Sequence, residues 1–293
     1  MIVFIHTLGV TRSYLLPLIR STLLLDSRWS DQEIIRTFTL TIPGHIEHDA
    51  EVSLENVHTE LLTITPEMAI MQKEIAHQLL LSHPREIITT LNDKKITLIG
   101  HGFGAMVALT FLFYHFSNVR RVALISCGNY FNAFALWRKK LSMLFISGRS
   151  RSFLTKAIAR TSEVWKKSEY SLFSENLNRK GYFSVLELMQ SFQAHEFFDK
   201  LSLDDQLKIL RIPILSLLGS NDSFVSAKSI LSLSRVFNVH SPVIQLKSNH
   251  ANIGDHLSES SFSTHFYPEA GHFLPETNTE EVSQDIQLFL RRK

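Results

Sequence analysis

The sequence predicts an α/β fold, with a mostly parallel, doubly wound sheet and an inserted helical cap. Short apolar segments rich in β-branched residues alternate with segments of helical period along most of the 293 residues. The strand-like segments are apolar on both faces, as expected for parallel strands that helices cover on two sides. Residues 129–205 show helical periodicity without a convincing strand. This block interrupts the alternation, so we interpret it as an insertion.

The first half of the chain alternates regularly. A buried strand is predicted at 2–5 (IVFI), a helix at 13–25, and a strand within 33–45 that ends in a Pro-Gly loop. Residues 66–91 are helical in pattern, with a break expected near Pro84, since proline cannot continue a helix. A strand at 95–99, a helix at 105–116 and a strand at 120–127 follow.

The second half returns to this alternation after the helical block. A strand is predicted at 212–219, a helix at 227–237, a strand at 261–268 after a polar loop, and a last helix from about Thr279. The predicted core is one sheet unit made of residues 1–128 and 206–293. The predicted cap is residues 129–205.

Composition narrows the functional classes. Hydrophobic residues make up 44% of the chain and charged residues 20%, which is enough for one large core. A net charge of +2 gives no polyanion-binding signature, so we expect no nucleic-acid partner. The single cysteine, Cys127, excludes an internal disulfide framework and suits a reducing compartment. With neither a signal-peptide pattern nor a long apolar stretch, we expect a cytoplasmic protein without a transmembrane segment.

Three polar or glycine-rich stretches follow predicted strands. Residues 96–109, ITLIGHGFGAMVAL, read as a strand, a very tight turn at Gly102 and a helix. Asp222 lies in LLGSNDSFV after a later strand, and His272 lies in YPEAGHFLPE after the last one. Because chemistry gathers at the carboxyl ends of parallel strands, we expect these three positions to meet.

These stretches resemble the α/β-hydrolase family. GHGFGA resembles the G-x-S-x-G elbow with Gly102 in place of the nucleophilic serine, GSNDSFV resembles the acid loop and AGHFLPE the histidine loop. HTLG at 6–9 and TIPGH at 41–45 resemble two further loops of the family, so the resemblance spans nearly the whole chain. It implies ester or thioester hydrolysis as the ancestral chemistry, with no metal and no organic cofactor. It also implies that Asp222 orients His272, and that the amides of Leu8 and Phe103 form an oxyanion hole.

The chain departs from the family pattern at several points. Gly102 has no side chain, so no acyl-enzyme can form there. Thr7 stands where the family usually has glycine and is expected to narrow the oxyanion loop, and Thr41 replaces the usual aspartate. By this resemblance the first predicted strand corresponds to the family's third, so we expect the family's first hairpin to be absent and a sheet edge to be left for covering or pairing.

Two functional interpretations follow from these departures. The preferred one is a protein that binds a small acyl-type ligand without ordinary esterase turnover. The alternative is a noncovalent enzyme (a slow hydrolase, lyase or cyclase) in which Asp222 and His272 act as a general base. A deliberate Ser→Gly change at 102 is a further explanation of the glycine. Cys127, at the end of a predicted strand, is a weaker candidate for a substitute nucleophile.

Other motifs point to different classes of protein. The stretch from Gly100 to Ala105 fits the dinucleotide fingerprint G-x-G-x-x-A, but the next strand ends LISCGN without the acid that would bind ribose. A dinucleotide-binding protein is kept as a second alternative because the glycine pattern fits, although the missing acid argues against it. His250, His256 and His265 match no metal template and indicate a polar loop.

The predicted cap carries a basic segment. Residues 138–167 hold nine Lys or Arg and one acid, with apolar residues interleaved at near-helical spacing. A solvated outer face is the simpler interpretation. The functional one is a basic, apolar lid that binds an acyl-CoA or acyl-carrier-protein substrate, with Arg149, Arg151 and Lys156 contacting the anionic carrier.

Overall fold

The computed structural model describes residues 2–7, 12–24, 35–41, 57–63, 95–132, 188–237, 244–246 and 262–291. These residues contain an eight-stranded sheet in the order β3-β2-β1-β4-β5-β6-β8-β7, in which every neighbouring pair is parallel. The strands are β1 (Ile2–Ile5), β2 (Ile35–Thr41), β3 (Val57–Thr63), β4 (Ile96–His101), β5 (Val119–Ile125), β6 (Ile214–Gly219), β7 (Ile244–Leu246) and β8 (Phe262–Tyr267).

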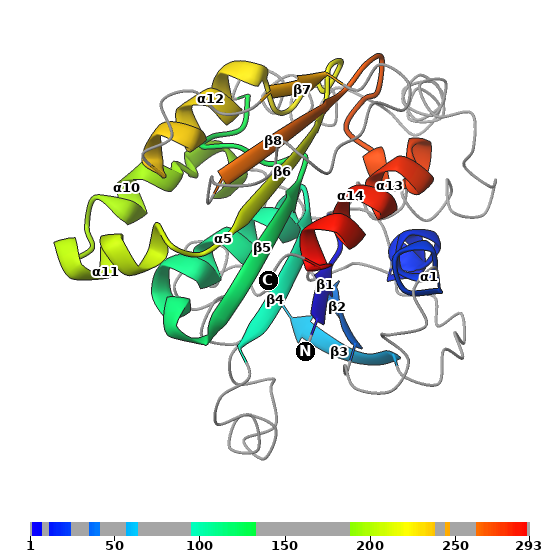
Figure 1. Ribbon diagram of the computed structural model, residues 1–293, viewed down its shortest axis with the longest axis horizontal. Coiled ribbons are helices and arrows are strands. Elements are labelled where there is room, and N and C mark those ends of the chain that lie inside the picture. Colours follow the sequence, from blue (N-terminus) through cyan, green and yellow to red (C-terminus); the bar gives the residue numbers. More distant parts are fainter. Residues whose placement is uncertain are drawn as a thin grey trace, which may run out of the picture.

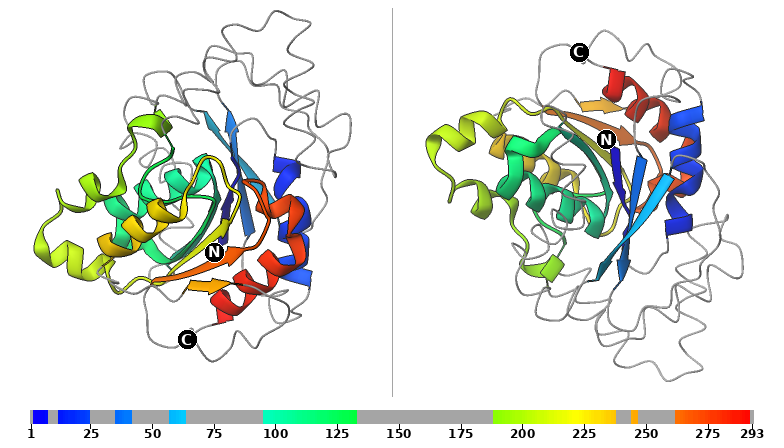
Figure 2. Two further views of the ribbon diagram at one scale, coloured as in Figure 1. Left: turned by 90° about the horizontal axis from the view of Figure 1, so that it is seen from above. Right: turned by 90° about the horizontal axis from the view of Figure 1, so that it is seen from below.

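Helices cover both faces of the sheet (Figures 1 and 2). One layer holds α5 (Phe103–His115), α10 (Ala194–Phe198), α11 (Leu203–Ile209) and α12 (Ala227–Val236). The other holds α1 (Leu16–Leu24), α13 (Leu274–Thr277) and α14 (Thr279–Arg291). Short 3-10 turns, η1 (Arg12–Leu15) and η3 (Phe116–Asn118), precede α1 and follow α5. None of the helices that the structure describes is both long and apolar enough to span a membrane.

The central strands are buried on both faces because each face packs against a helical layer. Every residue of β1, β4, β6 and β8 is buried. Val3 and Ile5 join the hydrophobic cluster on the α5 side, while Ile2 and Phe4 join the cluster on the α14 side. The predicted doubly wound, mostly parallel sheet is confirmed by this arrangement.

Arg121 of β5 fastens the last helix to the sheet. Its guanidinium Nη1 is buried and donates to the carbonyls of Phe289 and Leu290, at the C-terminal end of α14. The guanidinium also lies over the Phe289 ring, 5.9 Å from its centroid. A cation at this end of a helix is favourable because the carbonyls there lack intrahelical partners.

Two strands were not expected from the sequence. β3 pairs with β2 in parallel and forms one edge of the described sheet. β7, within the predicted polar loop, adds three residues beside β8 at the other edge. The predicted helix at 66–91, the loop at 42–45 and cap residues 133–187 lie outside the described residues. At the end of the predicted cap, Phe192 and Phe198 belong to the same hydrophobic cluster as α5.

Candidate active site

The turn between β4 and α5 has the geometry of a sharp strand-to-helix elbow. Gly102 is at its tip with φ +53° and ψ −114°, a conformation that residues with a side chain adopt only under strain. Its N–H donates to the carbonyl of Ile125, and its carbonyl accepts from the first turn of α5. Gly104 lets the helix approach β1, since a Cβ there would lie 2.3 Å from the Ile5 carbonyl oxygen. The predicted turn is therefore present, and α5 begins directly after it.

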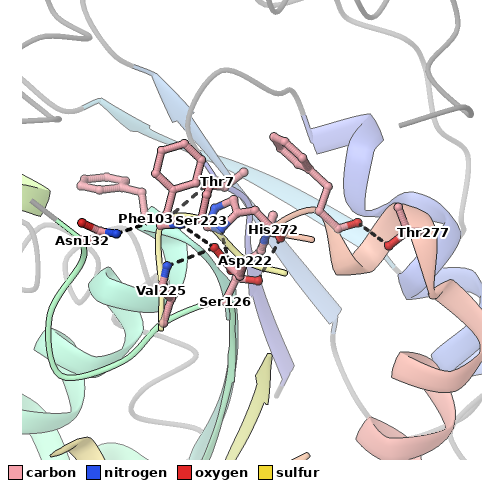
Figure 3. Close-up of polar contacts among 12 residues, drawn as sticks. Thr7, Phe103, Ser126, Asn132, Asp222, Ser223, Val225, His272 and Thr277 are labelled. Carbon is pink, nitrogen blue, oxygen red and sulfur yellow. Dashed lines mark hydrogen bonds and ion pairs between the residues drawn. The ribbon is translucent and has the colours of Figure 1, made fainter. Parts of the chain in front are cut away.

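The structure brings Asp222 and His272 together at the carboxyl end of the sheet. His272 Nδ1 lies 2.9 Å from Asp222 Oδ2, and the Asp222 side chain is fully buried (Figure 3). The other carboxylate oxygen, Oδ1, accepts from the N–H groups of Phe224 and Val225. Because a carboxylate only accepts, Nδ1 is the hydrogen-bond donor of this pair, and Nε2 is the ring nitrogen left for other partners.

His272 Nε2 faces the tip of the elbow. A Cβ placed on Gly102 would lie 3.1 Å from Nε2. No hydrogen bond of Nε2 occurs among the described residues. The acid, the histidine and the elbow thus meet, as expected from their places after β6, β8 and β4.

Two side chains hold the backbone of His272. His101 Nε2 and Ser126 Oγ both donate to its carbonyl oxygen, at 2.8 and 2.9 Å. Ser126 has φ +53°, a left-handed conformation that costs about 1–3 kcal/mol for a non-glycine residue. Phe224 and Phe273 pack edge-on against the imidazole ring. These contacts set the orientation of His272, and Ser126 was not identified from the sequence.

Thr7 lies against the tip of the elbow from the end of β1. Its Oγ1 accepts from the Phe103 N–H at 3.3 Å (Figure 3). It would lie only 2.3 Å from a Cβ on Gly102. The hydroxyl therefore stands where a side chain at 102 would begin. Leu8, the other predicted oxyanion donor, lies outside the described residues.

Two buried histidines stay neutral beside the site. Burial lowers the pKa of His6 to about 4, although the hydrogen bond from its Nδ1 to the Thr7 carbonyl opposes part of this shift. Burial also lowers the pKa of His101 well below its usual value, and the neighbouring His272 lowers it further. Both rings therefore act near neutral pH as uncharged hydrogen-bond donors to backbone carbonyls.

These lowered pKa values predict that acid destabilises the fold. Below pH 6.5 the unfolded chain gains a proton at His6 that the folded chain does not accept until about pH 4. The free energy of unfolding should therefore fall by about 1.4 kcal/mol per pH unit across this window, with His101 acting in the same direction. Urea unfolding at several pH values measures the slope. His6→Asn should flatten it, and an unchanged slope in that variant would contradict the assignment.

Cys127 lacks the features of a substitute nucleophile. Its thiol is fully buried at the end of β5. Burial, and next the charge of Asp222, raise its pKa well above the usual value for a thiol. Since the thiolate is the nucleophile, a thiol held protonated in this way is unreactive.

The remaining predicted positions are placed elsewhere or not described. Arg149, Arg151 and Lys156 of the basic segment, together with His250 and His256, lie outside the described residues. His265 is within β8, buried, with Nδ1 2.9 Å from Asp285, which also accepts from the Tyr267 hydroxyl. In the described part of the chain, no group of three or more His, Cys, Asp or Glu side chains is placed to hold a metal ion.

The chain is similar to known proteins over nearly its whole length. The model of a family described as "Alpha/beta hydrolase family" matches residues 2–285. Similar solved structures include a carboxylesterase from Bacillus subtilis, at 13% identity and a TM-score of 0.59, covering 99% of this chain and 83% of that one. A thermophilic esterase from Thermogutta terrifontis is 15% identical with a TM-score of 0.54, and the match covers 99% of this chain and 89% of that one. An E-2-(acetamidomethylene)succinate hydrolase is 14% identical with a TM-score of 0.55, and the match covers 100% of this chain and 91% of that one. A comparison with curated protein sequences finds no match.

Proposed function

The chain belongs to the alpha/beta hydrolase family, and from this premise we propose that it binds a small acyl-type ligand at the elbow without ordinary esterase turnover. One observation carries the proposal: an assembled Asp222–His272 pair faces a glycine at the tip of the elbow. The hydrogen-bonding groups of the site are kept, while the hydroxyl that would attack a carbonyl from position 102 is missing.

The missing side chain removes the covalent route. In a serine hydrolase, the histidine takes the proton of the nucleophile, whose oxygen then bonds to the acyl carbon. Gly102 has no oxygen to offer, so this bond cannot form at the elbow. In a serine protease of another fold, loss of the nucleophile costs on the order of a million-fold in turnover. Loss of this size leaves binding as the main remaining property of the site.

The ligand class is inferred from the family and the cap. The esterases named above act on esters, and by analogy this site takes an acyl group with a polar carbonyl end. The aromatic rings of Phe224 and Phe273 beside His272 add apolar surface at the site. The basic segment at 138–167 suits an anionic carrier, so an acyl-CoA or acyl-carrier-protein thioester is the form of ligand that we favour.

General-base chemistry is the second candidate function. Backbone N–H groups hold the Asp222 carboxylate in place through Oδ1, and its Oδ2 orients the His272 ring through Nδ1. Among the described residues, Nε2 of His272 has no hydrogen-bonding partner. Such a nitrogen can take a proton from water or from a substrate without a covalent intermediate. Retention of both residues in hydrogen-bonding geometry favours this function over simple decay of the site.

Binding and turnover measured together separate the two candidates. We expect fatty acids and acyl-CoA thioesters of increasing chain length to bind saturably in calorimetry. His272→Ala should change Kd by less than about tenfold, because a neutral hydrogen bond contributes about 1 kcal/mol. Turnover of p-nitrophenyl esters and acyl-CoA thioesters should be equal in the wild type and this variant. Turnover that His272→Ala and Asp222→Asn both abolish would instead establish general-base catalysis, and absence of saturable binding would refute the binding proposal.

A charge-reversal variant tests whether the basic segment at 138–167 binds the anionic carrier of the ligand. Changing Arg149, Arg151 and Lys156 to glutamate should weaken binding of acyl-CoA far more than binding of the free fatty acid, since the former carries several phosphate charges and the latter a single carboxylate. Equal affinity of wild type and variant for acyl-CoA would remove the basic segment from the proposal.

A further inference from the structure

The Thr7 hydroxyl is bonded to the amide that would stabilise an oxyanion. Phe103 is the residue after the tip of the elbow, and its N–H donates to Thr7 Oγ1 at 3.3 Å. In the elbow of this fold, that N–H is one of the two donors to the oxygen of a tetrahedral intermediate. We propose that Thr7 occupies the oxyanion position and thereby blocks a latent, noncovalent hydrolysis by the Asp222–His272 pair.

The block follows from the number of protons available. An amide N–H has one proton, so it cannot serve Thr7 Oγ1 and a developing oxyanion at full strength together. Oxyanion stabilisation depends on donors that are already aimed at the place where charge develops. In this structure the Phe103 donor is aimed at an oxygen of the protein itself, so a bound ester must displace Thr7 before its carbonyl can polarise.

The surroundings of Thr7 hold it in this place. Its side chain is buried, with 3% of the residue exposed, and its carbonyl accepts from His6 Nδ1 at 2.7 Å. The missing Cβ of Gly102 supplies the space for the hydroxyl, since that Cβ would lie 2.3 Å from Oγ1. The glycine at the tip and the hydroxyl beside it are thus two parts of one arrangement.

If the Thr7 hydroxyl left the oxyanion position, the site could hydrolyse an ester with water as the nucleophile. His272 Nε2 takes a proton from water as the water oxygen bonds to the ester carbonyl carbon, and the carbonyl oxygen becomes an oxyanion on the Phe103 N–H. The bond from this carbon to the leaving oxygen then breaks, and the proton passes from His272 to the leaving alkoxide. Every atom comes from water and ester, so no other reactant is needed.

The test compares four variants of the full chain on p-nitrophenyl acetate. Thr7→Gly should raise the total kcat/KM about a hundredfold over wild type, and the whole gain should depend on His272, because one oxyanion donor is worth about 10²–10³ in kcat. Thr7→Ser keeps the hydroxyl and Thr7→Val keeps the shape, so both should stay within about threefold of wild type. Adding His272→Ala to Thr7→Gly should remove the gain. Circular dichroism checks that each variant folds, and Thr7→Ala replaces Thr7→Gly if the latter does not.

The results also separate this inference from the proposed function on which it rests. His272-dependent turnover by the wild type would overturn the proposal of binding without turnover, whatever the Thr7 variants do. A folded Thr7→Gly or Thr7→Ala protein with no gain would overturn the block, even if acyl ligands bind as proposed. Lower activity in Thr7→Gly and Thr7→Val, with activity kept in Thr7→Ser, would overturn it in favour of a reacting Thr7 hydroxyl.

Discussion

Gly102→Ser combined with Thr7→Gly is expected to create a covalent esterase. The serine Cβ would stand 3.1 Å from His272 Nε2, so the imidazole must shift by a few tenths of an ångström, and the serine hydroxyl is then within reach of that nitrogen. Removal of Thr7 Oγ1 relieves the 2.3 Å approach. A nucleophile is worth on the order of a million-fold in an optimised serine hydrolase, and a 1 Å misplacement costs about 10²-fold. We therefore expect kcat/KM for p-nitrophenyl acetate to rise at least about a thousandfold over wild type.

Acylation is measured directly by a stoichiometric burst of p-nitrophenol and by the mass of the acylated peptide that contains the introduced serine. Gly102→Ser alone should show little of either, because its side chain meets the Thr7 hydroxyl. Gly102→Ala with Thr7→Gly is the matched control, since it adds the Cβ without the oxygen. If the folded double variant is not acylated, Gly102 does not occupy the nucleophile position.

Gly104→Ala is expected to be strongly destabilising. A Cβ at 104 would lie 2.3 Å from the Ile5 carbonyl oxygen, 2.5 Å from that of His6 and 2.7 Å from the Ile5 carbonyl carbon, all backbone atoms. Helix propensity by itself favours alanine over glycine by about 1 kcal/mol, so it predicts the opposite sign. We expect the overlap of the new Cβ with backbone atoms to outweigh this helix preference and to lower the free energy of unfolding by about 3 kcal/mol or more.

Gly271→Ala is the matched control, because a Cβ on Gly271 meets no heavy atom within 4 Å among the described residues other than its two sequence neighbours. Its stability should stay within about 1 kcal/mol of wild type. Urea unfolding of the two variants measures the difference, and similar midpoints would show that α5 is not held as close to β1 as the structure places it.

The central sheet was predictable because its strands are short segments rich in apolar and β-branched residues. β1, β4, β6 and β8 have no exposed residue, although β8 (FSTHFY) buries three polar side chains that the apolar pattern alone does not explain. β3 was not predicted, since VHTELLT mixes charged and apolar residues as a strand at a sheet edge does. β7 was missed because three residues are too few to show a period.

The acid, the histidine and the elbow were predictable as a group, because each follows a strand and resembles a family loop. The gap between Asp222 and His272 is longer than the family leads one to expect, and β7 lies within it. Thr7 could be recognised as a departure from the family, but its bond to Phe103 depends on a contact between residues 96 positions apart. Ser126 and the buried His265–Asp285 pair likewise depend on tertiary packing that local sequence does not encode.

The shared space at Gly102 and Thr7 restricts the order in which substitutions can accumulate. A chain with serine at 102 and threonine at 7 would place two side chains in one volume. For descent from a serine form with glycine at 7, the route that avoids this overlap loses the serine before it gains the threonine. Once threonine is in place, reversion at 102 alone no longer restores the earlier site, so the pair behaves as an epistatic ratchet.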